Sequence, residues 1–165
     1  MENPEKALQF LKRQGFVIVS TLDANGGIHC SAKGILVLGK EEKVFIVDLY
    51  FNRTFKNLKR DPRISITAID EHNFLGYTLQ GKGVILSQKE MKSDVIDEWE
   101  RSILKRMSKR VVKGVRSGIR SKGHFEASLP SRPKYFIEFI IENIIDLADS
   151  LPGDKPPKRA NKSAK

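Results

Sequence analysis

The chain has little cysteine and no long apolar run, and each shortage excludes a class of protein. Cys30 is its single cysteine, so no disulfide can form within the chain, and no cysteine–histidine cluster suggests a zinc site. No apolar run reaches the ~18 residues that a membrane-spanning helix needs. The opening residues, MENPEKALQF, carry early acidic residues and no apolar signal-peptide region. We therefore expect a cytoplasmic protein without a membrane segment.

Familiar catalytic motifs are also missing from the sequence. It contains no nucleophile elbow, no P-loop and no dinucleotide-binding glycine motif. The histidines His29, His72 and His124 fall in different predicted elements, and none has an acidic residue at a suggestive spacing. We expect all three to be structural, and the sequence alone names no catalytic residue.

Length and charge indicate one domain with basic additions. The 165 residues and the hydrophobic content of 39% suit a single soluble domain, expected over residues 1–150. Residues 101–122 hold nine Lys or Arg and no acid, and the tail from residue 153 adds +4. Together these segments carry +13 against +10 for the whole chain, so the remaining body is at about −3. Residues 151–165 are poor in apolar side chains, and we expect a disordered basic tail.

Hydrophobic patterns predict an α+β fold. We expect a helix after Pro4, then strands at 16–22, 28–38, 44–47, 64–69 and 77–86, whereas the pattern at 135–147 suits either a final strand or a helix. Residues 44–47 are apolar on both faces, which is typical of a buried strand. Ser87 and Glu90 have the spacing of a capping box, which predicts a helix over about 88–116. Its apolar stripe, which includes Val95 and Trp99, indicates core or dimer contact.

A short basic helix at about 52–60 is the strongest candidate for a binding element. Asn52 is a suitable N-cap, and Arg53, Thr54 and Lys56 lie in the first turn. Free backbone N–H groups beside fixed cations form an anion site that suits phosphate, because an arginine can hold two oxygens at once. The alternative is a solvated basic helix that only joins two strands.

The order of these segments resembles a known family. An acidic-glycine turn at 23–27 follows the first strand, Asn52-Arg53-Thr54 stands where the family often has Ser-Arg-Lys, and Asn57-Leu58 and Pro62 follow at the family's spacing. Residues 16–86 thereby resemble the FMN-binding split β-barrels related to pyridoxamine 5′-phosphate oxidase. The resemblance implies a six-stranded antiparallel split β-barrel of Greek-key type with flanking helices. It also implies FMN as cofactor and a homodimer with the flavin at the subunit interface.

The resemblance further implies which residues contact the flavin. The phosphate would be held by Arg53 and Thr54 with Lys56 and Asn57, although Asn57 could instead be structural. The lysine that the family usually has at position 54 is absent, and Lys33 could replace its charge from the side. The ring would lie against the second strand and the end of the third, with Gln80 nearby; the candidates there are Ser31, Ala32, Lys33, Val47 and Asp48. Asp48 would face the ribityl hydroxyls or solvent, because an anion opposes a reduced, anionic ring.

The function expected from the resemblance is that of an FMN-dependent oxidoreductase acting on an unidentified small molecule. The substrate-binding pattern of the oxidase itself is not evident, so oxidation of vitamin B6 is not expected. One alternative is a deazaflavin- or haem-handling relative, in which His124 could be the axial ligand of haem. Another is a nucleic-acid-binding module that uses Lys105, Lys109 and their basic neighbours. Stacking aromatics are missing from that basic run, which disfavours single-strand binding.

Overall fold

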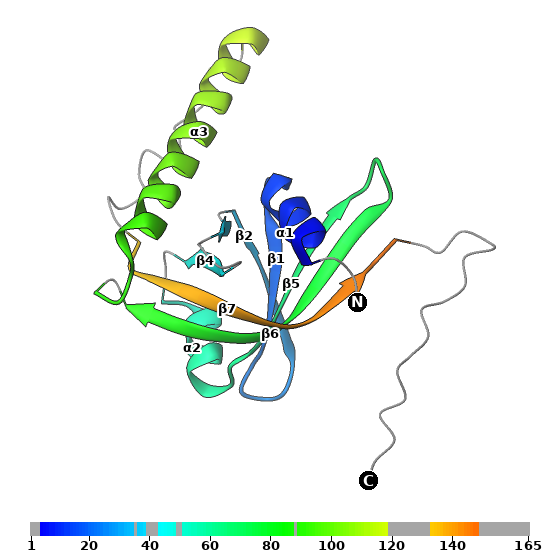
Figure 1. Ribbon diagram of the computed structural model, residues 1–165, viewed down its shortest axis with the longest axis vertical. Helices are drawn as coiled ribbons and strands as arrows, with labels where there is room; N and C mark the ends of the chain where they lie inside the picture. The colour runs from blue at the N-terminus through cyan, green and yellow to red at the C-terminus, as the bar shows by residue number, and fades with distance from the viewer. Residues whose placement is uncertain are drawn as a thin grey trace, which may run out of the picture.

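The protein is a strongly curled antiparallel sheet with helices around it (Figure 1). The computed structural model describes residues 4–34, 36–38, 43–48, 51–87, 89–118 and 133–148. The helices are α1 (Pro4–Arg13), α2 (Arg53–Arg60) and α3 (Ser93–Ser117). The strands are β1 (Val17–Leu22), β2 (Ile28–Lys33), β3 (Leu36–Leu38), β4 (Val44–Asp48), β5 (Arg63–Asp70), β6 (Leu75–Ser87) and β7 (Tyr135–Asp146). The predicted basic tail and His124 lie outside the described residues.

The strand order explains why the sheet curls into a barrel. In the described part of the chain, seven strands pair in the order β2-β1-β5-β6-β7-β4-β3, which places β2 and β3 at opposite edges. These two edge strands are consecutive in the chain, with only residues 34 and 35 between them. Such a connection spans at most about 10 Å, so the two edges must come close together. The predicted α+β split barrel is therefore confirmed.

The count of seven strands differs from the predicted six because residues 28–38 form two strands. Residues 28–33 pair with β1, whereas residues 36–38 pair with β4 on the other edge. The one signal at the break is Gly34, which the interior of a strand can also contain, so the pattern alone did not reveal it. The last strand is confirmed, since Tyr135–Asp146 pairs with both β4 and β6.

The core has two parts, one on each face of β4. Val44 and Ile46 lie in the barrel interior, together with residues of α1 and most of the strands. Phe45 and Val47 point to the opposite face, where they pack with Val95 and Trp99 of α3. The prediction of a strand buried on both faces is thus confirmed.

Two predicted helix ends differ from the structure. The Glu90 carboxylate does accept bonds from Ser87, at 2.7 Å from its N–H and 2.6 Å from its hydroxyl. The Ser87 hydroxyl donates to Glu90 and caps no helix N–H. The pair therefore closes a turn at the end of β6, and α3 begins only at Ser93. Asn52 does precede α2 in extended conformation, but its side chain makes no capping bond.

The β1–β2 hairpin turn follows its sequence closely. The Asp23 carboxylate accepts the backbone N–H groups of Asn25 and Gly27, each at 2.8 Å. Gly26 has φ of 81°, a conformation that glycine adopts without steric cost. These two hydrogen bonds lower the pKa of Asp23 below its usual value. The turn sets the register that places Ser31 opposite Val19 and Lys33 opposite Val17, on the interior face.

Candidate functional site

Helix α2 is held against the barrel by two polar contacts from its inner face. The Asn57 amide donates to the Thr21 hydroxyl at 3.0 Å, and the Thr54 and Ser31 hydroxyls lie 3.2 Å apart. Thr54 and Asn57 are buried together with Leu58 of the same helix. Because their spacing puts them on one helical face, these side chains orient α2 and direct its basic residues outward.

A buried charge cluster lies where β2, β4 and β7 meet. One oxygen of Asp48, which is 3% exposed, is 2.7 Å from the Lys33 ammonium and 2.6 Å from the Tyr135 hydroxyl. Burial raises the pKa of Tyr135, and its hydrogen bond to the Asp48 carboxylate raises that pKa further. Tyr135 therefore stays a proton donor, and Asp48 lies near one compensating cation. Of the two environments expected for Asp48, exposure to solvent is wrong, because its side chain is enclosed by Lys33 and Tyr135, whereas contact with the ribityl hydroxyls stays a prediction.

An aromatic group covers this cluster on the side of α2. The rings of Phe51 and Tyr135 are stacked, with centroids 5.2 Å apart and planes at 14°. The Phe55 ring packs edge to face against both, with its centroid 4.7 Å from that of Phe51 and 4.9 Å from that of Tyr135. Phe51 is half exposed, whereas Tyr135 is buried. The group therefore offers an apolar aromatic surface beside the start of α2.

The outer face of α2 carries the predicted phosphate ligands. Arg53 and Lys56 are both exposed, and their i, i+3 spacing puts them on one side of the helix. The first backbone bond of the helix joins the Lys56 N–H to the Asn52 carbonyl at 3.1 Å. The N–H groups of residues 53–55 precede that bond and point toward the helix start. Donors and cations suited to an oxyanion therefore lie on the same side of the molecule.

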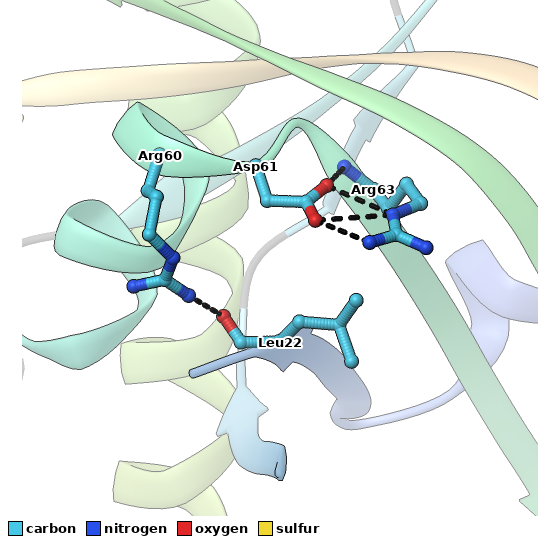
Figure 2. Close-up of polar contacts among 4 residues, drawn as sticks. All are labelled: Leu22, Arg60, Asp61 and Arg63. Carbon is cyan, nitrogen blue, oxygen red and sulfur yellow. Dashed lines mark hydrogen bonds and ion pairs between the residues drawn. The ribbon is translucent and has the colours of Figure 1, made fainter. Parts of the chain in front are cut away.

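The far end of α2 is fastened separately (Figure 2). Arg60 donates to the carbonyl of Leu22 at the end of β1. Asp61, the next residue, forms an ion pair with the Arg63 guanidinium, whose Nε lies 3.0 Å and 3.1 Å from the two Asp61 carboxylate oxygens. These side-chain hydrogen bonds, together with one from the Arg63 backbone N–H, lower the pKa of Asp61 to about 2. Arg60 and Asp61 thus secure the α2–β5 junction, away from the helix start.

Not every predicted residue joins the site. Ser31, Lys33, Asp48, Thr54 and Asn57 come together between the strands and α2. Ala32 is exposed on the other face of β2, and Val47 packs toward α3. Gln80 lies on the outside of β6, where its side-chain oxygen accepts a bond from Asn143 at 3.3 Å. Any contact of these three with a ligand must come from the backbone, from a different face or from a second copy of the chain.

Sequence reasoning missed Thr21, Phe51 and Tyr135. Thr21 alternates in phase with Val17 and Val19 and so belongs to the interior face, which could have been read from the sequence. The pairing of Tyr135 with Asp48 could not, since the two residues are 87 positions apart. Within the described residues, no three His, Cys, Asp or Glu side chains form a group that could hold a metal ion, and no helix is long and apolar enough to cross a membrane.

Curled antiparallel strands with a helix between β4 and β5 define a split-barrel protein, and solved structures agree. HupZ of Group A Streptococcus aligns with a TM-score of 0.60 at 17% identity, over 93% of this chain and 100% of that one. An FMN-binding protein of Syntrophomonas wolfei aligns with a TM-score of 0.56 at 15% identity, over 90% of this chain and 87% of that one. An F420 reductase aligns with a TM-score of 0.55 at 12% identity, over 87% of this chain and 98% of that one. Identities this low show the shared fold.

The sequence itself identifies the family. Residues 4–142 match the sequence model of the pyridoxamine 5′-phosphate oxidase family. The match spans most of the 165 residues, so the chain belongs to that family. No curated protein sequence matches the chain.

Proposed function

We propose that this protein binds FMN as a homodimer and acts as an oxidoreductase on a small molecule. The observation that carries the proposal is the outward placement of Arg53 and Lys56 beside the open N-terminal end of α2. Family membership and the FMN-binding structural relative support it. When bound, the flavin supplies the redox chemistry, and the protein positions it and the substrate.

The residues present fit the phosphate of FMN. Arg53 would hold it through two N–H groups, with Lys56 and the helix N–H groups completing the charge balance. Thr54 and Asn57 face inward, so their part is to orient α2. This arrangement removes the need for a lysine at position 54.

The charge cluster also fits a flavin ring at the ends of β2 and β4. A lone carboxylate there would oppose negative charge on the reduced ring. The ammonium of Lys33 offsets that charge, since its Nζ is 2.7 Å from Asp48, and the Tyr135 hydroxyl donates to the same oxygen. The half-exposed ring of Phe51 provides an apolar wall beside this position.

Two exposed apolar side chains on the outer face of the sheet support the homodimer. Val84 and Ile140 are 40% and 50% exposed. The register partner of Ile140 on β6 lies two residues from Val84, so both side chains point to the same outer face of the paired strands β6 and β7. A second copy that covers this face would shield both side chains from water.

Binding to FMN and to riboflavin, measured in parallel on apoprotein, tests the proposal. FMN should bind more tightly, because riboflavin lacks the phosphate, and light scattering should give a dimer. A visible spectrum of the purified protein separates the alternatives, since haem gives a Soret band and flavin absorbs near ~450 nm. Equal affinity for the two ligands, or a monomer that binds flavin fully, would contradict the proposal.

A further inference from the structure

A basic groove separates α1 from α3, away from the outer face of α2. It has a volume of about 670 Å³ and lies between the end of α1, the start of β1, the end of β2 and the middle of α3. Seven basic residues and one acidic residue line it: Lys12, Arg13, Lys33, Arg101, Lys105, Arg106, Lys109 and Glu98. So strong an excess of one charge in a concave surface attracts anions.

Three of these cations are available to a ligand. Glu98 is within 3.4 Å of Lys12 and 3.1 Å of Arg101, and Lys33 is held by Asp48. Arg106 donates to the Gly15 carbonyl and thereby fixes α3 to the turn after α1. Arg13, Lys105 and Lys109 form no ion pair within the part of the chain that the structure describes.

Two of the available cations lie in a row on α3. Lys105 and Lys109 lie one helical turn apart, about 6 Å along the axis of α3. Arg116 is exposed two turns beyond Lys109 and continues the basic surface. Figure 1 shows the later turns of α3 standing clear of the sheet, so that a long ligand could follow the helix. A row of charges with this spacing suits consecutive phosphates of an extended strand.

An aromatic side chain from another element lies in the same groove. Phe16, in the turn between α1 and β1, lines the groove and is 61% exposed. An exposed ring beside a phosphate-binding track can stack on a base whatever its sequence. The basic run at 101–122 has no aromatic residue, so Phe16 of a different segment supplies the stacking ring that this run lacks.

We propose that this groove binds single-stranded nucleic acid, with phosphates on Lys105, Lys109 and Arg13 and a base on Phe16. The contact is independent of base sequence and does not use Arg53 or Lys56; Lys33, which pairs with Asp48, lies both in the groove and at the proposed position of the flavin ring. Three phosphate contacts predict a slope of about −2 for the logarithm of affinity against the logarithm of salt concentration. Affinity should therefore fall about twentyfold between about 50 and 200 mM salt.

Fluorescence anisotropy with a labelled oligothymidylate of about 12 nucleotides tests the proposal. The double variant Lys105→Gln/Lys109→Gln should reduce the slope to about −0.7, because one contact remains. The matched control, Lys6→Gln/Lys89→Gln, removes two exposed charges outside the groove and should leave the slope unchanged. Phe16→Ala should weaken binding by about tenfold, the loss of one stacked base. Emission from the buried Trp99 checks that every variant is folded.

Competition with other phosphates identifies the ligand. The oligonucleotide should compete better than thymidine triphosphate, which can use only part of the row. Equal competition by the triphosphate would overturn the strand assignment in favour of a mononucleotide pocket. Equal binding of inorganic polyphosphate, with no effect of Phe16→Ala, would overturn it in favour of simple ion exchange. Equal loss in the two double variants would show that net charge, and not the groove, attracts the strand.

Discussion

Asp48 is the residue whose replacement tests the structure most directly. Its carboxylate is buried and within 2.7 Å of the Lys33 ammonium. Asp48→Asn keeps the shape of the side chain but leaves that ammonium without its partner. Breaking a buried ion pair in this way typically costs about 3–5 kcal/mol. The Lys33 side chain retains 15% exposure, so water relieves part of the penalty and we expect about 3 kcal/mol.

The measurement is urea denaturation of the apoprotein, followed through the emission of Trp99. This residue is the single tryptophan and is 2% exposed, so its signal reports on the packing of α3 against β4. In a thermal melt followed by the same emission, a loss of ~3 kcal/mol in a chain of 165 residues should lower Tm by about 6–12 °C. A double-mutant cycle with Lys33→Met isolates the ion pair from the effects of either residue alone.

The double variant separates this explanation from simple loss of packing. Lys33→Met/Asp48→Asn removes the unpaired charge, so it should recover about 2 kcal/mol relative to Asp48→Asn. The reasoning is refuted if Asp48→Asn costs less than about 1 kcal/mol, or if the two single losses simply add.

Three further predictions concern α2, β6 and the α2–β5 junction. Arg53→Ala should lower the affinity for FMN about thirty- to a hundredfold in titrations, whereas Lys59→Gln on the same helix should leave it unchanged. Equal losses of affinity in the two variants would indicate general electrostatics. Gly81→Ala should destabilise by about 1–3 kcal/mol in thermal melts, because its Cβ would lie 1.9 Å from a backbone oxygen of β7. Gly15→Ala, with open space around its Cβ, is the matched control and should be nearly neutral. The pKa of Asp61 falls from 3.8 to about 2 on folding, so its stabilising effect is complete above pH 3.8 and lost as pH falls toward 2. The Tm difference between wild type and Asp61→Asn should shrink over that range, and a constant difference would contradict this.

Local patterns in the sequence determined the elements of this protein. Alternation of apolar residues predicted the strands, and the run at 44–47 correctly indicated a strand covered on both faces. Side-chain hydrogen bonds over two to four residues set the hairpin turn at Asp23. These features depend on close neighbours in the chain, which is why sequence reasoning identified them. The family resemblance, which also rests on such ordered local segments, was confirmed.

Only the tertiary structure decided how the polar residues are partnered. Residues 28–38 divide between two strands because closure of the barrel brings two sheet edges together at that point. The same closure brings Lys33 of β2 to Asp48, which pairs with Tyr135 on the neighbouring strand. The fold also places Phe16 in a groove with cations of α3. Such contacts depend on which distant segments the curled sheet brings within a few ångströms of each other, and no local pattern carries that information.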